Sequence, residues 1–252
     1  MKKLRSFKTI LAQVPAVLLV TGYACCAQLP SEGVPAGVSA AMLQLFGNAT
    51  AFTARADVRV LDNSRNERIR TPVDFAALDG KLRAEIDMTQ IRSKELPPAA
   101  LAGLKQLGVD RVVSVVRPDR KVIYIIYPRA KSYANLPMAK EAATARDFKV
   151  AKTVLGKETL DGHLCVKNQV VVKNGTNVLL AATTWNASDL KDFPVQIATK
   201  ENDLTSILRF QQIRFVRVKA SQFEPPAGYT RYRDPQSLML ELSKKVTSSK
   251  GR

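Results

Sequence analysis

The sequence predicts a mainly β protein in which one long antiparallel sheet curls into a barrel or half-barrel, with only short helices between strands. Apolar and polar residues alternate along many segments, which is typical of strands with one buried face. Asp-Gly and Asn-Gly pairs, which favour tight hairpin turns, separate these segments. Roughly ten strands are expected, and a sheet this wide exposes long edges unless it curls.

The strongest local pattern lies in residues 154–199. Valines alternate with other residues over 166–173, an Asn-Gly turn follows at 174–175, and the chain then runs back as a second strand. An Asp-Gly turn at 161–162 precedes this hairpin. Three or four antiparallel strands are therefore expected to follow one another as a meander.

Residues 1–27 have the layout of a secretory signal peptide: a basic start, an apolar run over 9–20 and small residues before Ala27. Because Gln13 and Pro15 interrupt the apolar run, it is a poor membrane span, which needs about 20 apolar residues. Cleavage after Ala27 is expected, and the alternative is a lipid anchor at Cys25. In either case the protein is expected to be exported to the periplasm or the cell envelope, with no transmembrane span after signal cleavage.

The chain is strongly basic. Removal of the four basic residues in 1–27 lowers the net charge from +17 to +13. This charge favours anionic neighbours such as lipid head groups, envelope polysaccharides or acidic partners, and the alternative is a soluble basic surface with no specific partner. No nucleic-acid-binding signature is present. Only Cys165 remains after cleavage at Ala27, so no internal disulfide is expected and stability must come from the core.

The remaining chain is expected to form one domain. Residues 28–37 contain two prolines and two glycines and predict a flexible leader. The domain is expected over 38–245, and a disordered tail over 246–252. It opens with a short amphipathic helix, because apolar residues recur at helical spacing from Val38 until Gly47.

The first strands show the clearest alternation. Residues 52–60 and 82–88 each place apolar side chains on one face and charged side chains on the other. A partner strand is expected over 66–76, with an Asp-Gly turn at 79–80. Strands with one solvated face are typical of antiparallel sheets.

The next hairpin is apolar on both faces. It follows a short helix that is opened by Pro97-Pro98 and closed by Gly108. Residues 112–116 and 122–127 form its strands, and both faces must be covered. A helix or a ligand is therefore expected on the second face. Residues 133–147 form a crossover that the sequence leaves open between a helix and a loop.

The last third returns to strand pattern over 204–218 and leaves the sheet through the proline-containing turn at 223–229. Asp234 then has the position of an N-cap, with Pro235 at the first helical position, so a final short helix is expected.

The sequence contains little that could form an active site. His163 is the single histidine, and Cys165 stands two residues further on, which is no standard metal spacing. On one strand two side chains at this spacing point in the same direction and are not directed at each other for proton transfer. A structural histidine is therefore expected. No nucleophile elbow, phosphate loop or zinc-protease helix is present. We therefore expect a non-enzymatic protein with no catalytic residue, metal or cofactor.

Three segments, at residues 155–168, 184–194 and 223–229, resemble exported bacterial domains of unassigned function. Those domains are grouped with the LolA/LolB-like outer-membrane lipoprotein carriers. The resemblance covers residues 50–230 and implies a strongly curved, LolA-like antiparallel half-barrel whose concave face is closed by short helices. In the carriers this face forms a hydrophobic cavity that shelters acyl chains. The matching motifs are turns and strand starts, so they support a fold more than an activity.

These observations predict an exported binding protein that shelters a lipid, an acyl chain or another apolar group. The alternative is an envelope protein–protein interaction or sensor domain on the same fold without bound lipid. Strand alternation and the apolar hairpin give eight candidates for the cavity lining, which could equally be ordinary core: Phe52, Val58, Leu82, Ile86, Tyr124, Ile126, Leu180 and Trp185. The identity of the ligand and the oligomeric state do not follow from the sequence.

Overall fold

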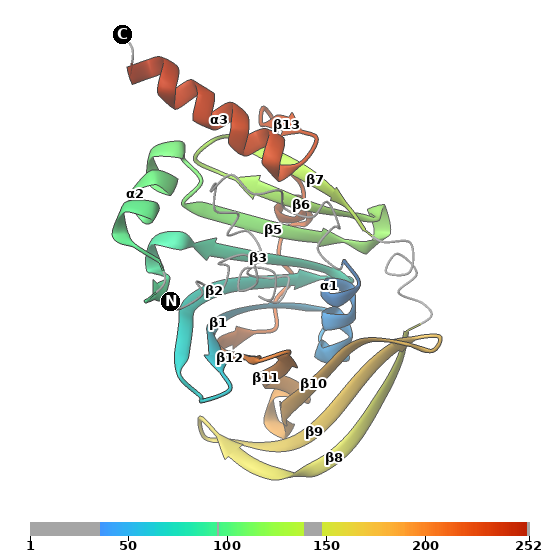
Figure 1. Ribbon diagram of the computed structural model, residues 1–252. Coiled ribbons are helices and arrows are strands. Elements are labelled where there is room, and N and C mark those ends of the chain that lie inside the picture. The colour runs from blue at the N-terminus through green and yellow to red at the C-terminus, as the bar shows by residue number, and fades with distance from the viewer. Residues whose placement is uncertain (1–35, 95, 139–147, 251–252) are drawn as a thin grey trace.

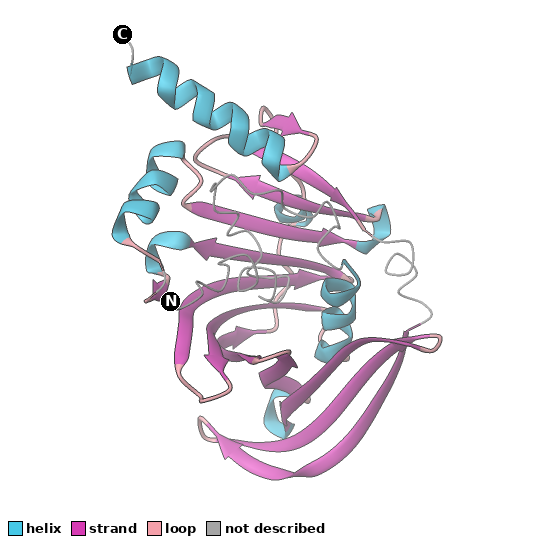
Figure 2. Cartoon of the chain, in the orientation of Figure 1, coloured by secondary structure: helices cyan, strands magenta, loops and turns pink. Residues whose placement is uncertain are grey.

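The computed structural model describes residues 36–94, 96–138 and 148–250. The strands of this part form one 13-stranded sheet in the order β13-β7-β6-β5-β3-β2-β1-β12-β11-β10-β9-β8, with β4 beside β2. Every neighbouring pair along this order is antiparallel except β13 with β7. The sheet is open and curved, with short helices at its concave side (Figures 1 and 2). The predicted fold class, a mainly β half-barrel, is confirmed.

The elements have the following bounds. The strands are β1 (Ala51–Asp62), β2 (Glu67–Leu78), β3 (Lys81–Asp87), β4 (Arg92–Ser93), β5 (Arg111–Arg117), β6 (Val122–Tyr127), β7 (Ser132–Pro137), β8 (Phe148–Leu160), β9 (His163–Asn174), β10 (Asn177–Ala187), β11 (Phe193–Glu201), β12 (Leu204–Arg214) and β13 (Thr230–Tyr232). The helices are α1 (Ala36–Leu43), α2 (Pro98–Leu107) and α3 (Pro235–Lys250). Short 3-10 turns are η2 (Gln44–Phe46), η3 (Met88–Gln90), η4 (Pro118–Arg120), η7 (Ser188–Leu190) and η8 (Ala220–Phe223).

The central meander is confirmed as β8 to β11. Its first turn uses Asp161 at φ 50° and Gly162 at φ 84°, and its second contains Gly175 at φ 59°. These left-handed conformations match the twist of a two-residue hairpin, which is why Asp-Gly and Asn-Gly pairs predict it.

The concave face carries the main core because every second residue of the first strands points into it. In β1 the even-numbered residues from Phe52 to Val60 are buried, whereas the odd-numbered ones are half-exposed. The same alternation buries Leu82, Ala84 and Ile86 in β3. The predicted first helix is present as α1 and η2, and it ends at Gly47 with φ 55°. It begins at Ala36, inside the predicted leader.

The β5–β6 hairpin is covered on both faces, as its sequence predicts. The covering group on the convex face is the fully buried ring of Phe223 in η8, not a ligand. Residues 215–229 follow β12 and run behind the sheet to β13 (Figure 1). Val218 and Tyr229, from the same segment, also pack against this convex apolar cluster, whose buried members include Val113, Val115, Tyr124 and Ile126.

Arg117, at the end of β5, binds this covering segment through hydrogen bonds. Its side chain is 6% exposed and donates to the carbonyl of Phe223 over 3.2 Å and to the carboxylate of Glu224. It also donates to both carboxylate oxygens of Asp119, over 2.9 and 2.7 Å. The hydrogen bond from Arg117 is the main cause that lowers the pKa of Asp119, and the reciprocal bond raises the pKa of Arg117.

The C-terminal helix α3 starts as predicted. Asp234 accepts from the backbone N–H and the hydroxyl of Ser237, over 2.7 and 3.0 Å, and Pro235 is the first helical residue. The helix continues to Lys250, so its last turns occupy positions where the sequence predicts a disordered tail. Within the crossover at 133–147, residues up to Pro137 belong to β7. Residues 139–147, the signal peptide with Cys25 and the leader up to residue 35 lie outside the described residues.

We expect Phe223→Ala to lower the free energy of unfolding by about 3 to 5 kcal/mol, because it removes a fully buried ring and leaves a cavity over β5 and β6. Urea unfolding followed by circular dichroism measures this change. Leu240→Ala is the control, since Leu240 is 58% exposed on α3 and its loss should stay within about 0.5 kcal/mol. A similar small effect of both variants would contradict the anchoring role of Phe223.

We also expect stability to fall when the pH drops below the ordinary aspartate pKa of 3.8, because the folded protein holds the pKa of Asp119 below this value. The ionised carboxylate is therefore favoured by folding, and its contribution is complete above pH 3.8 and lost as the pH falls through the lowered pKa. Chemical unfolding of wild type and Asp119→Asn across this range tests the assignment. The variant should be less stable at neutral pH and less sensitive to acid, and equal acid sensitivity would refute it.

Candidate functional site

The concave face of the half-barrel is the largest apolar surface of the described residues. It brings together side chains from β1, β2, β3, β5, β6, β9, β10, β11 and β12 in one cluster, and α1, η2 and α3 add further residues to it. It contains both small and branched side chains, such as Ala54, Ala56 and Val58 on β1. A face of this composition can take up apolar groups by shape and burial alone, without polar contacts.

Phenylalanine rings fill the centre of this face. Phe46 on η2 lies 4.9 Å from the ring centroid of Phe52 and 5.6 Å from that of Phe193. Phe193 also lies 4.9 Å from Phe52 and 5.6 Å from Phe210. Most of these pairs have the tilted or edge-to-face geometry that aromatic rings prefer. The middle of the concave face is therefore protein core, held by η2.

Five of the eight predicted lining residues meet on this face. Phe52, Val58, Leu82 and Ile86 are buried members of the main cluster, and Leu180 is half-buried against it. Phe52 contributes to the aromatic centre, whereas Leu82 and Ile86 lie on β3, towards the end of the sheet that α2 and α3 cover (Figure 1).

Tyr124 and Ile126 do not lie on the concave face, so their prediction as lining residues is wrong. Both belong to the convex cluster beneath Phe223. Their neighbours Ile123 and Ile125 face the concave side instead. Because β6 is apolar at every position, alternation could not indicate which of its two faces points inward.

Trp185 is also on the convex side, packed with Cys165, Ala187 and Val195 in a third cluster. Its indole N–H donates to the carboxylate of Glu158 over 2.8 Å, and the Lys167 ammonium lies 5.0 Å from its ring centroid. Trp185 is five positions from Leu180 on β10, and an odd separation on a regular strand places two side chains on opposite faces.

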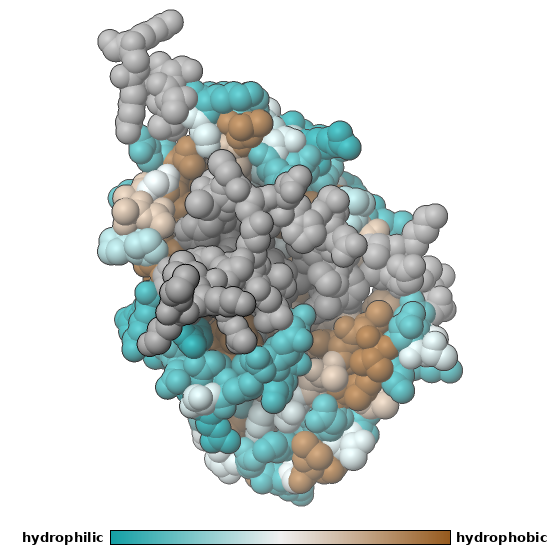
Figure 3. Space-filling view, viewed as in Figure 1, coloured by the Kyte–Doolittle hydropathy of each residue, from teal (hydrophilic) through white to brown (hydrophobic). Residues whose placement is uncertain are grey.

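Helices α2 and α3 form a rim along one border of the concave face. Helix α2 has no buried residue, yet its half-exposed Leu104 and Leu107 pack against the main cluster. Helix α3 contributes the buried Leu238 and Leu242. The two helices contact each other, and Figure 3 shows apolar surface between them. Leucines that are only partly buried can gain further burial from an apolar ligand.

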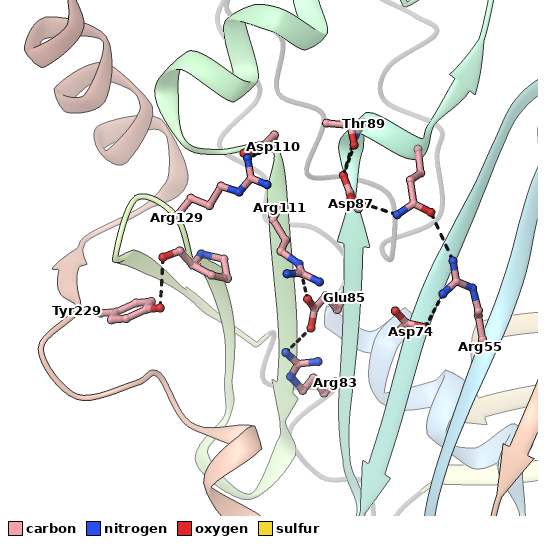
Figure 4. A network of polar contacts seen from close by, with 12 residues as sticks. Arg55, Asp74, Arg83, Glu85, Asp87, Thr89, Asp110, Arg111, Arg129 and Tyr229 are labelled. Carbon is pink, nitrogen blue, oxygen red and sulfur yellow. Dashed lines mark hydrogen bonds and ion pairs between the residues drawn. The ribbon is translucent and has the colours of Figure 1, made fainter.

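An ion pair with a buried carboxylate lies beside this rim. The side chain of Asp110, between α2 and β5, is 1% exposed, and its Oδ2 lies 2.7 Å from Nη1 of Arg129 in the β6–β7 turn. Neither carboxylate oxygen receives a hydrogen bond of good geometry from the described residues, so Arg129 supplies the charge compensation (Figure 4). A Cβ at Gly108 would lie 3.3 Å from the backbone nitrogen of Ala130, so the end of α2 and this turn are in close contact.

The convex face of the first strands is a solvated ion-pair surface. Glu85 bridges Arg83 and Arg111, each at 2.6 Å, and Asp74 lies 3.7 Å from Arg55 (Figure 4). An open groove of about 450 Å³ lies beside it, lined by Asp57, Arg70, Pro72, Thr89, Gln90, Ile91 and Arg92. Arg70 is bound to Asp57 over 2.9 Å within this groove. These carboxylates are partners of arginines and are not poised for proton transfer.

The side chains of His163 and Cys165 have different surroundings. Nδ1 of His163 lies 2.6 Å from Oδ2 of Asp189, and this hydrogen bond lowers the pKa of Asp189. Cys165 is buried, and burial raises the pKa of its thiol, which disfavours the thiolate. Among the described residues, no group of three or more His, Cys, Asp and Glu side chains could hold a metal ion. No helix within these residues has the length and apolar composition of a membrane span.

Sequence comparison identifies no relative for this chain. No protein-family model matches it, and no curated protein matches it.

Solved structures similar to the chain include three proteins of bacterial origin. Lipoprotein LppX of Mycobacterium tuberculosis is 12% identical, with a TM-score of 0.37 over 71% of this chain and 95% of LppX. A LolA superfamily protein of Nitrosomonas europaea is 9% identical, with a TM-score of 0.33 over 76% and 97%. MucB, in the Pseudomonas aeruginosa MucA/MucB complex, is 12% identical, with a TM-score of 0.34 over 75% and 62%. A LolA superfamily member is thus among the similar structures, but TM-scores this low carry no conclusion about a ligand or a partner.

We expect Arg129→Met to destabilise the protein by about 3 kcal/mol, because it leaves the buried carboxylate of Asp110 without a cation. Adding Asp110→Asn should restore at least half of this loss, since the buried group is then neutral. Arg120→Met is the control: Arg120 is 52% exposed and pairs with Glu224, so its loss should cost less than about 1 kcal/mol. Urea unfolding of these three variants and of Asp110→Asn alone measures the coupling, and additive effects of the two rim substitutions would contradict it.

Proposed function

We propose that this protein is a non-enzymatic, exported binding protein that shelters a lipid, an acyl chain or another apolar group against its concave face. The observation that carries the proposal is the rim: Leu104 and Leu107 of α2 lie against the main core but stay half-exposed. Since the phenylalanine centre is filled, the ligand would lie between α2, α3 and the strands near Ile86, and not in the middle of the sheet.

Burial of apolar surface is sufficient for such binding. Each buried methylene contributes about 0.8 kcal/mol, so half of a sixteen-carbon chain supplies roughly 6 kcal/mol. Helix α2 can move at low cost because it buries no side chain completely. A displacement of α2 would exchange the contacts of its leucines with the core for contacts with an acyl chain.

The positively charged side chains at the rim favour a ligand with an anionic head group. Lys105 is exposed in the last turn of α2, and the Arg129 side chain is 54% exposed in the adjoining turn. A head group near these two cations would stay in water while its acyl chain follows the leucines. This arrangement agrees with the net charge of the chain and with docking on anionic envelope surfaces.

A second candidate function, an envelope protein–protein interaction or sensor domain without lipid, is favoured by a different observation. Val154 and Leu155 of β8 are 65% and 54% exposed, far from the rim. Apolar side chains exposed side by side on a strand can contact a protein partner.

Native mass spectrometry of the mature protein, purified from its own envelope and followed by solvent extraction, tests the first function. We expect a stoichiometric lipid or acylated mass. Leu104→Asn with Leu107→Asn should weaken retention of that mass about tenfold, because two apolar contacts become polar. Leu240→Asn, at an exposed position of α3, should retain it. An apo mass for the wild type would refute the lipid-binding function and favour the second candidate.

A further inference from the structure

The two edges of the sheet are built in opposite ways. At one end, β13 has three residues and lies against α3. At the other end, β8 has 13 residues and pairs only with β9. Short, covered edges resist further pairing, whereas a long edge strand presents a row of free backbone groups. Among the described residues, β8 is therefore the open edge of the sheet.

A bulge limits the usable length of β8. The register with β9 shifts between Val154 and Gly156, and Leu155 has no partner residue on β9. Residues 148–154 before the bulge form a regular stretch of strand, about as long as a typical strand in a globular protein. Bulges disrupt further pairing, so this stretch is the part of the edge that can accept another strand.

This stretch carries positive charge and no acidic residue. Lys149 and Lys152 are exposed, and no ion pair to either is formed within the described part of the chain. Lys149 stands directly opposite Lys173 of β9 in the register. Like charges at directly opposite positions are destabilising, and an acidic residue on an added strand would relieve this repulsion.

Apolar side chains alternate with these lysines. Val150 and Val154 are 38% and 65% exposed. They share with Lys152 the face that continues the concave side, because Val172 opposite Val150 and Val170 opposite Lys152 are core residues. Figure 3 shows apolar surface at the lower end of the molecule, where β8 and β9 lie in Figure 1. Lys149 lies on the opposite face of β8, so an incoming strand that alternates apolar and acidic residues would place its acidic residues beside Lys149 and its apolar residues beside Val150 and Val154.

We propose that residues 148–154 of β8 bind an extended, acidic segment of another protein by strand addition. Backbone hydrogen bonds along the edge supply affinity, and Lys149 selects acidic side chains. A second copy of this chain is the wrong occupant, because β8 against β8 would bring lysines next to lysines. This surface is separate from the α2–α3 rim and does not depend on the proposed lipid-binding function.

The test is fluorescence anisotropy with the mature protein and a labelled, acetylated peptide of sequence Glu-Val-Glu-Val-Thr-Val-Glu-Val-Glu. We expect saturable binding that weakens with added salt. Lys149→Glu with Lys152→Glu should weaken it roughly tenfold, through the loss of attraction to Lys149 and the added repulsion from two new carboxylates on the edge strand. The control variant is Lys157→Glu with Lys200→Glu, which makes the same change in charge beyond the bulge and on β11, and it should stay within about twofold.

A second peptide separates strand addition from plain charge attraction. Glu-Val-Glu-Pro-Thr-Pro-Glu-Val-Glu has the same charge but cannot form a continuous ladder, and we expect roughly tenfold weaker binding. Equal binding of both peptides, equal effects of the two charge-reversal variants, or no binding of the first peptide would each overturn the proposal. It would also be overturned if Lys149→Glu with Lys152→Glu removed binding to phosphatidylglycerol vesicles but left peptide binding unchanged.

Discussion

The whole structure depends on covering one apolar face of a very wide sheet. The sheet is a single ladder of backbone hydrogen bonds from β13 to β8, and its concave side is apolar along most of that length. Curvature reduces the exposed apolar area, because it brings the ring of Phe52 on β1 within 4.9 Å of the ring of Phe193 on β11, across the intervening strand β12. Helices α1, α2 and α3 and the turn η2 contribute to the cover within the described residues, together with short connections such as those at Met88 and Met138. The border that they cover least, at α2, is where we place the ligand.

The convex face differs in composition between the two halves of the sheet. Around β1 and β3 it is a lattice of arginine–carboxylate pairs that water can solvate, as at Arg83, Glu85 and Arg111. Around β5 and β6 it is apolar and needs a cover of its own. The chain supplies this cover after β12, and Arg117 joins the covering segment to the end of β5. The convex face around β5 and β6 is therefore covered by the chain itself.

Much of the fold could be predicted from the sequence, because two local signals are unusually regular here. Alternation located β1 and β3, and the turn pairs at 79–80, 161–162 and 174–175 located the hairpins, since each needs left-handed backbone. The site could be predicted only in part. On β6 both faces are apolar, so nothing local indicates that Tyr124 points outward, whereas the odd separation of Leu180 and Trp185 could have excluded one of them. The rim depends on contacts between α2, α3 and distant strands, which no local pattern encodes.

The position of β1 in the sheet constrains how the protein can fold. β1 lies between β2 and β12, and this pairing brings Asp62 next to Leu204. β1 therefore joins two halves of the sheet, namely the strands from β13 to β2 and the strands from β12 to β8. Its pairing with β12 is a contact between residues far apart in the sequence. Such contacts form slowly, because the loop-closure entropy must be overcome before they contribute. During synthesis from the N-terminus, the hairpins within each half can form early. The two halves can join only after β12 has been synthesised. Until then β1 has an unpaired edge, which makes this interval the one in which a chaperone or an aggregation partner would compete for the chain.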